Sequence, residues 1–278
     1  MLVNLNEVLK KAQKEKYAVG LFNTTDTDML QAVIEAAEES NSPVILGTAE
    51  VLLPYGELKL IAPSVIAAAK RAKVPVVVHY DHGLTFDRCI EALKLGFSSI
   101  MFDGSAKPYE QNIAETRETV KIAHAFGATV EGEIGHVGEA AKEDNLLTDM
   151  YTTPEEAKAY LDATGVDALA VAIGSAHGVY KKKPMLNIER LKEISGEVKV
   201  PLVLHGGSGL SDDDFKNTIR NGIAKVNIFT DLCLAGERAM KDGEEKKLGY
   251  LETRSLKVEY IKEAVKHKMA LFGSVNKA

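Results

Sequence analysis

The chain has 278 residues, of which 45% are hydrophobic and 27% are charged. This composition is ordinary for a globular protein and excludes a largely disordered chain. The 34 basic and 40 acidic side chains give a net charge of −6. Because nucleic acid binding needs a dense basic face, this balance argues against a nucleic acid partner.

The two cysteines, Cys89 and Cys233, lie far apart, and neither belongs to a C-x-x-C pair. A disulfide framework is therefore not indicated, and a reducing cytoplasm fits the chain better. Residues 1–16 lack the continuous apolar run of a signal peptide, and no stretch approaches the length of a membrane span. We therefore expect a soluble, cytoplasmic protein without a membrane partner.

Short apolar runs alternate with longer amphipathic runs along the whole chain. Eight apolar runs predict strands, at 17–22, 43–46, 74–79, 98–102, 128–134, 168–173, 201–205 and 224–228. Amphipathic patterns between them predict helices, including those at 29–39, 85–95, 110–126, 154–164 and 211–221. Near-continuous apolar strands are typical of parallel sheets that are covered on both faces. Eight such units predict the α/β class and a (β/α)8 or TIM barrel.

Nothing in the composition divides the chain. It contains no linker rich in glycine and serine and no low-complexity tract, so we expect residues 1–278 to form a single TIM-barrel domain. The longest connection without a clear pattern runs from 135 to about 153. Loops of that length in compact domains are often functional, so this segment is a candidate mobile active-site loop.

Polar side chains stand at or just after the ends of the predicted strands. In chain order they are Asn23, Asp81 with His82, Asp103, Glu133, His177, His205 and Asn227. TIM barrels carry their reactive groups at the C-terminal ends of the strands, so we expect these side chains to converge on one rim. Three histidines with an open fourth position form a common catalytic zinc site. A lone histidine at a strand end is more often structural, but three on one rim beside carboxylates favour metal ligation.

Three of the four remaining histidines receive other interpretations. His79 alternates with Asp81 along its strand, which predicts a supporting or substrate-contacting role. His124 and His267 lie in helical segments and are expected to be surface or packing residues.

Two glycine-rich or polar turns lead into helices after the last two predicted strands. They read H-G-G-S-G at 205–209 and N-I-F-T-D at 227–231. Glycine lets the backbone approach an anion, and the free amides of a helix start favour negative charge. The loops after strands seven and eight recurrently bind phosphate in this fold. We therefore expect a phosphate site that Gly178 and Lys181 complete; a turn that merely reverses the chain is the alternative.

These stretches together resemble the class II, metal-dependent ketose-bisphosphate aldolases. The matching stretches are F-N (22–23), P-V-I-L (43–46), H-Y-D-H-G (79–83), D-G-S (103–105), E-G-E-I-G (131–135), G-S-A-H-G (174–178), H-G-G-S-G (205–209), K-V-N-I (225–228) and F-G-S (272–274). They occur in order through almost the whole chain. The resemblance implies an enzyme that cleaves and forms a carbon–carbon bond in a phosphorylated ketose.

The resemblance also implies roles for single residues. His82, His177 and His205 would hold zinc or another divalent metal, with a monovalent cation possible beside it, and Glu133 matches a carboxylate that can approach the metal. Asp81 would move a proton at the substrate hydroxyl or aldehyde oxygen. Elements that bind dihydroxyacetone phosphate would be Gly178, Gly206, Gly207, Ser208, Asn227, Ile228, Phe229 and Thr230. A dication can stabilise the enediolate left by cleavage without a lysine Schiff base.

Two departures from the family pattern leave parts of the site open. Many members carry Gly-Gly followed closely by Glu-Asp in the mobile loop, whereas residues 137–144 read V-G-E-A-A-K-E-D. Glu139 and Glu143 are therefore both candidates for a second base. Residues 256–260 lack the arginine that helps such aldolases to bind a distal phosphate; Arg254 and Lys257 are candidate substitutes.

The expected substrate is a ketose 1,6-bisphosphate of the fructose or tagatose type, cleaved to dihydroxyacetone phosphate and an aldehyde such as glyceraldehyde 3-phosphate. One alternative is a ketose 1-phosphate without the distal phosphate, whose aldehyde half is a sugar acid or a longer chain. Another is a non-catalytic barrel that binds sugar phosphates. A barrel metallohydrolase is disfavoured, because no H-x-H pair stands on an early strand. By analogy with the family, we expect a homodimer or homotetramer.

Overall fold

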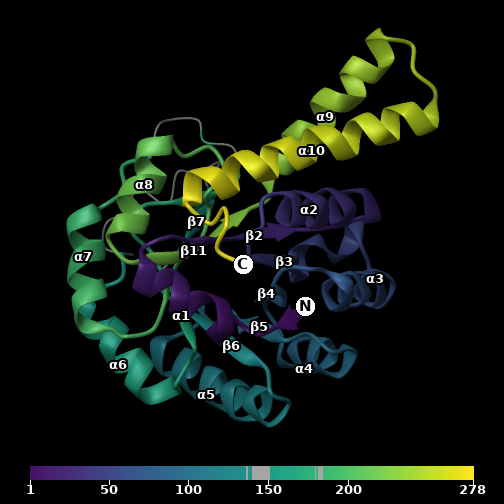
Figure 1. Cartoon of the computed structure of the whole chain (residues 1–278). Coiled ribbons are helices and arrows are strands. Elements are labelled where there is room, and N and C mark those ends of the chain that lie inside the picture. Colours follow the sequence, from purple (N-terminus) through teal and green to yellow (C-terminus); the bar gives the residue numbers. More distant parts are fainter. Residues whose placement is uncertain (136, 140–150, 179, 181–183) are drawn as a thin grey trace.

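The computed structural model describes residues 1–135, 137–139, 151–178, 180 and 184–278, and its core is a closed barrel of parallel strands (Figure 1). The barrel strands are β2 (Val19–Asn23), β3 (Val44–Ala49), β4 (Val76–Gly83), β5 (Ser99–Phe102), β6 (Thr129–Ile134), β8 (Ala168–Val171), β10 (Leu202–Leu204) and β11 (Ile223–Ile228). Each strand pairs in parallel with two neighbours, and the pairings β4–β5 and β11–β2 complete the ring. The predicted TIM barrel is confirmed.

The observed strands differ from the predicted ones mainly at their ends. Strand β4 continues to Gly83, so Asp81 and His82 lie within the strand and not after it. The reason is pairing with both neighbours: the parallel register with β3 extends as far as Asp81 opposite Ala49, and Gly83 pairs with Phe102 of β5. Three further short strands were not predicted, namely β1 (Leu2–Val3), β7 (Gly138–Glu139) and β9 (Ala176–His177).

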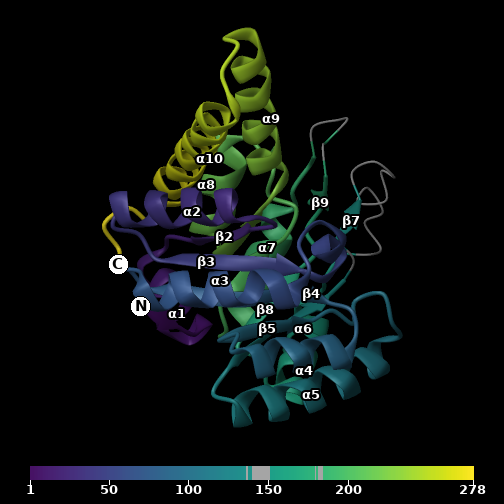
Figure 2. The same cartoon turned by 90° about the vertical axis from the view of Figure 1, so that its right-hand side faces the viewer.

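Helices cover the outside of the barrel and one of its ends (Figure 2). They are α1 (Leu5–Glu15), α2 (Thr27–Glu39), α3 (Leu58–Arg71), α4 (Phe86–Leu95), α5 (Tyr109–Ala125), α6 (Pro154–Thr164), α7 (Ile188–Glu197), α8 (Asp212–Arg220), α9 (Thr230–Glu245) and α10 (Tyr250–Phe272), with a 3-10 helix η1 (Glu50–Tyr55). The five helices predicted above are confirmed within two residues at each end. Side-chain caps set the starts of α2, α6 and α8; at α8 the hydroxyl of Ser211 accepts a hydrogen bond from the backbone of Asp214.

The barrel interior is apolar at one end and polar at the other. At the end where the strands begin, Val19, Ile45, Val77 and Val203 form one buried cluster with residues of α1. Since side chains alternate along a strand, the same inward-facing rows continue toward the other end with polar residues, for example from Val77 to His79 and Asp81 on β4. Helix α1 therefore closes one mouth of the barrel, and the polar groups gather toward the other.

Helices α9 and α10 form an arm that extends well beyond the barrel (Figure 1). The two helices pack against each other, and α10 returns along α2 to the barrel. In the part of the chain that the structure describes, no helix combines the length and apolar character needed to cross a membrane.

Candidate active site

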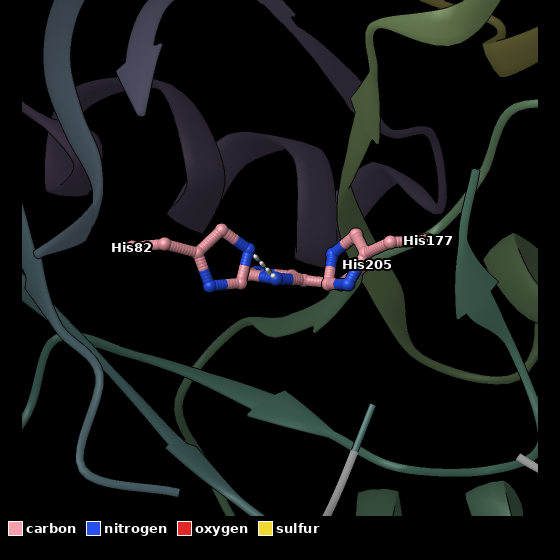
Figure 3. Close-up of side chains that lie close together, drawn as sticks. All are labelled: His82, His177 and His205. Carbon is pink, nitrogen blue, oxygen red and sulfur yellow. Dashed lines mark hydrogen bonds between the residues drawn. The ribbon is translucent and has the colours of Figure 1, made fainter. Parts of the chain in front are cut away.

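Three histidines from distant parts of the chain meet at the C-terminal mouth of the barrel (Figure 3). His82 comes from the end of β4, His177 from β9, and His205 directly follows β10. The ring centroid of His82 lies 4.9 Å from that of His177 and 4.4 Å from that of His205. One nitrogen from each ring lies within 4.8 Å of the others. The backbone of His82 has a φ of 45°, a left-handed conformation that costs energy for a residue with a side chain and is common at functional sites.

Two carboxylates hold the outer nitrogens of these rings. His82 donates from Nδ1 to Asp103 Oδ2 at 2.7 Å, and His205 donates from Nε2 to Glu131 Oε1 at 2.8 Å. The remaining nitrogens, His82 Nε2 and His205 Nδ1, face each other at 2.8 Å. Two such lone pairs in contact require positive charge, either a bound cation or a proton on one ring. Carboxylates behind imidazole ligands are the usual arrangement in metal sites.

The third ring and the local charge also fit a cation. His177 Nε2 is buried and has no hydrogen-bond partner among the described residues, which is costly unless another group satisfies it. Burial lowers the pKa of His177 to about 3, so its ring is neutral at ordinary pH. Burial alone would also lower the pKa of His82, but the charges of Asp81 and Asp103 raise it to about 10. The histidine cluster is therefore consistent with a divalent metal.

Glu133 lies beside this cluster on β6. Its Oε2 atom is 3.4 Å from His205 Nδ1, and it is buried without a hydrogen bond from the described residues. Burial and the nearby charge of Asp103 raise the pKa of Glu133 to about 8. A carboxylate in this position could approach a cation held by the histidines.

Asp81 is held rigidly at the edge of the same site. Asn23 donates from Nδ2 to Oδ2 at 2.8 Å, and Asn227 donates from Nδ2 to Oδ1 at 3.0 Å. Burial alone would raise the pKa of Asp81, but the charges of His82 and Lys225 hold it well below its usual range. Asp81 is therefore an oriented carboxylate that can accept a proton.

A cavity of about 510 Å³ opens above these groups. Its lining includes most of the residues that the sequence singled out, namely Asn23, Asp81, His82, Asp103, Glu133, His177, Gly178, Gly206, Gly207, Ser208, Asn227, Ile228, Phe229 and Thr230. The lining also includes the apolar residues Val51, Leu52 and Leu84. His205 lies fully buried beneath the lining.

The two expected phosphate-binding loops lie next to each other. Ser208 Oγ accepts hydrogen bonds at 3.3 Å from the backbone N–H groups of Phe229 and Asp231, at the start of α9. Gly206 adopts a φ of 65°, and a Cβ atom there would stand 2.2 Å from the backbone oxygen of Ala176. The close approach of these two backbones requires glycine at position 206.

Exchanging Gly206 for alanine should therefore destabilise the protein more than the same exchange at Gly178. Both positions have positive φ, which costs alanine about 1–2 kcal/mol. Gly206→Ala adds a backbone collision, and overpacking of this kind typically costs about 1–3 kcal/mol more. At Gly178, no atom of the described residues lies within 4 Å of an added Cβ. Urea unfolding of both variants checks this, and equal losses of unfolding free energy would refute the steric argument.

Two residues that the sequence predicts to be part of the site, Glu143 and Lys181, lie outside the described residues. The backbone of Glu139 pairs with that of His177 between β7 and β9, which places this stretch beside the site. Arg254 and Lys257 form ion pairs with Asp28 and Asp26 at 2.8 Å, and neither is among the described residues that line the cavity.

Sequence reasoning assigned no role to two buried charged residues, Glu131 and Lys225. Both stand in motifs that carried the resemblance, E-G-E and K-V-N-I. Their positions in the sequence could have indicated a role. Glu131 lies two residues before Glu133, and Lys225 two before Asn227, so each faces the same side of its strand as a candidate site residue.

A TIM barrel with convergent histidines, an oriented carboxylate and a glycine-rich loop defines a metal-dependent barrel enzyme. Residues 3–277 match the family described as fructose-bisphosphate aldolase class-II. The chain therefore belongs to this family of metal-dependent aldehyde-lyases.

Individual relatives agree with this assignment. The chain is 41% identical to a fructose-bisphosphate aldolase of Thermus caldophilus, with full coverage of both chains. It is also 41% identical to the uncharacterized protein YdjI of Escherichia coli, again over both whole chains. The crystal structure of the YdjI aldolase superposes with a TM-score of 0.92 at 38% identity, covering 100% of both chains. A putative fructose-1,6-biphosphate aldolase from Coccidioides immitis gives 0.89 at 28% identity, covering 99% of this chain and 97% of that one.

Proposed function

We propose that this chain reversibly cleaves a ketose 1,6-bisphosphate, of the fructose or tagatose type, to dihydroxyacetone phosphate and an aldehyde such as glyceraldehyde 3-phosphate. The observation that carries the proposal is the convergence of His82, His177 and His205 beside Asp81, in one cavity with the glycine-rich loop. The Thermus caldophilus relative is named as a fructose-bisphosphate aldolase, which supports the bisphosphate substrate.

The three histidines would hold zinc, with Glu133 close enough to approach it. Another divalent metal could take the place of zinc, and a monovalent cation could bind beside it. When bound, the metal polarises the substrate oxygens and stabilises the charge of the enediolate that cleavage produces.

Asp81 would perform the proton transfer on the aldehyde side. In the direction of cleavage it accepts the proton of the C4 hydroxyl, and in the direction of synthesis it returns that proton to the aldehyde oxygen. The amide groups of Asn23 and Asn227 orient this carboxylate, and the charges of His82 and Lys225 lower its pKa and so keep it ionised. A second proton exchange, at C1 of the triose phosphate, would fall to Glu139 or Glu143.

The phosphate of the triose would lie against the loops after β10 and β11. Ser208 contacts the backbone at the start of α9, and the N-terminus of a helix favours an anion. The same cavity is lined by Gly178, Asn227, Ile228, Phe229 and Thr230, and Lys181 remains a candidate contact.

A ketose 1-phosphate is the second candidate substrate, and one feature of the cavity lining supports it. Among the described residues that line the cavity, none is a lysine or an arginine. A distal phosphate would need such a partner from elsewhere, whereas the apolar side chains Val51, Leu52 and Leu84 accept an uncharged chain. A barrel that only binds sugar phosphates, without turnover, is the third candidate.

One assay separates these candidates. The zinc-loaded protein is given fructose 1,6-bisphosphate, tagatose 1,6-bisphosphate and fructose 1-phosphate, and release of triose phosphate is followed through a coupled dehydrogenase. We expect the highest kcat/KM for a bisphosphate. A higher value for the monophosphate would transfer the assignment to the second candidate, and binding without release would leave the third.

We further propose that residues 1–278 act as one cytoplasmic domain that assembles into a homodimer or homotetramer. Both cysteines are free, in keeping with a reducing compartment. The arm of α9 and α10 exposes apolar side chains, with Met240 at 53%, Tyr250 at 83% and Leu251 at 69%. Exposed apolar patches often mark protein interfaces. The molar mass from light scattering should be that of a dimer or tetramer, and a monomer mass would contradict the proposal.

A further inference from the structure

Three polar side chains lie inside the barrel directly beneath the histidine cluster. They are His79 on β4, Glu131 on β6 and Lys225 on β11, and each is 0% exposed. Interior positions of TIM barrels are usually filled by branched apolar side chains. A buried charge is costly unless it is paired and hydrogen-bonded. The partners of these residues must therefore explain their presence.

Glu131 joins Lys225 to the histidine cluster. Its Oε2 atom lies 2.7 Å from Lys225 Nζ, and its Oε1 atom accepts the hydrogen bond from His205 Nε2 at 2.8 Å. His79 is a more distant neighbour, with Nε2 3.9 Å from Glu131 Oε2 and Nδ1 2.8 Å from Ser99 Oγ. The direct chain of contacts thus runs from Lys225 through Glu131 to His205.

The ion pair determines what Glu131 can do chemically. Lys225 Nζ lies 2.7 Å from Glu131 Oε2 and both side chains are fully buried, so the lysine ammonium has an ionised carboxylate as its partner. An ionised carboxylate can only accept hydrogen bonds. His205 must then donate from Nε2, which leaves Nδ1 as a lone pair directed at His82.

The second carboxylate of the site shows why a lysine is needed here. Asp103, which supports His82, is 13% exposed and receives hydrogen bonds from the backbone and hydroxyl of Ser105 at 3.1 and 2.6 Å. Glu131 has no such contact with the solvent. Asp103 therefore keeps its charge through local donors and water, whereas Glu131 depends on a buried cation.

We propose that Lys225 is a positioning residue for the metal site, which holds Glu131 as an acceptor-only carboxylate and thereby fixes the ring orientation and tautomer of His205. Lys225 is not among the residues that line the cavity, so it acts on the site through Glu131. The inference rests on the proposed role of the three histidines as metal ligands.

The test is the zinc affinity of a Lys225→Met variant, measured by competition with a chromogenic chelator. Partners of metal ligands typically contribute 10-fold to 100-fold in affinity, so we expect Kd for zinc to rise by about that factor. The matched control is Ile45→Val, which removes one methylene from the barrel interior without touching a polar group, and it should leave Kd unchanged. An unchanged Kd in folded Lys225→Met would overturn the proposal.

A second variant guards against misfolding, because Lys225→Met leaves Glu131 as an unpaired buried carboxylate. The double variant Lys225→Met with Glu131→Leu replaces the pair by apolar groups, an exchange that proteins often tolerate. We expect a melting temperature of the metal-free protein near that of the wild type, together with the same loss of zinc affinity. If stability returns and zinc affinity returns with it, the pair is merely structural and the proposal is wrong.

The same titration of the wild-type protein distinguishes failure of the proposed metal-dependent function from failure of the role of Lys225. Failure of the wild type to bind zinc would refute the proposed metal-dependent function itself. Tight binding by the wild type and by all variants alike would refute the role of Lys225 alone.

Discussion

Replacement of Asp81 by alanine is expected to lower kcat for ketose cleavage by 10²-fold to 10⁴-fold, the usual contribution of a positioned acid or base. Asp81 is the carboxylate that two amide donors, from Asn23 and Asn227, orient into the cavity. Without it, water must accept the proton of the C4 hydroxyl. The measurement is release of triose phosphate under saturating substrate.

Two further measurements show whether the loss of kcat in Asp81→Ala comes from the missing proton transfer and not from loss of the metal or of the fold. Zinc content should remain at the wild-type value, since Asp81 does not belong to the histidine cluster. Exchange of the C1 proton of dihydroxyacetone phosphate with solvent should also continue, because that step uses a different base. Asp213→Ala, a change at an exposed position on α8, serves as the control. A kcat for Asp81→Ala within threefold of the wild type would rule out the assigned role.

Replacement of His177 by alanine is expected to remove both the metal and the activity. The ring supplies a neutral, buried nitrogen that no described residue satisfies. Two histidines would remain, and a tetrahedral zinc site of three protein ligands would be incomplete. Loss of several kcal/mol of charge stabilisation corresponds to a fall in kcat/KM on the order of 10³-fold or more.

The matched control is His124→Ala. His124 is an exposed histidine on α5 that pairs with Asp167 at 2.9 Å, far from the cluster in the sequence. This variant should keep wild-type zinc content and turnover, as measured by atomic emission and by triose phosphate release. Full zinc content in His177→Ala would show that the ligand set is different.

The barrel and the location of the site could be predicted from the sequence because both follow from local patterns. Apolar runs of strand length recur eight times, and polar residues such as Asn23, Glu133 and Asn227 stand where those runs end. In a barrel of parallel strands such ends meet on one rim. The convergence of His82, His177 and His205 follows from the same rule.

Other features depend on contacts between distant segments, which no local pattern contains. The extension of β4 to Gly83 follows from its pairing with β3 and β5, and the pairing of β7 with β9 joins two segments that the sequence predicts as loops. The link from Lys225 to Glu131 crosses the barrel between strands far apart in sequence. Glu143 and Lys181 stay predictions, since both lie outside the described residues.

The most direct test of the central claim is exhaustive chelation of the purified protein, followed by titration with zinc while triose phosphate release is measured. We predict that turnover falls to background and returns in full at one equivalent of zinc per chain. Turnover that survives chelation undiminished would contradict the assignment of a catalytic cation to the three histidines.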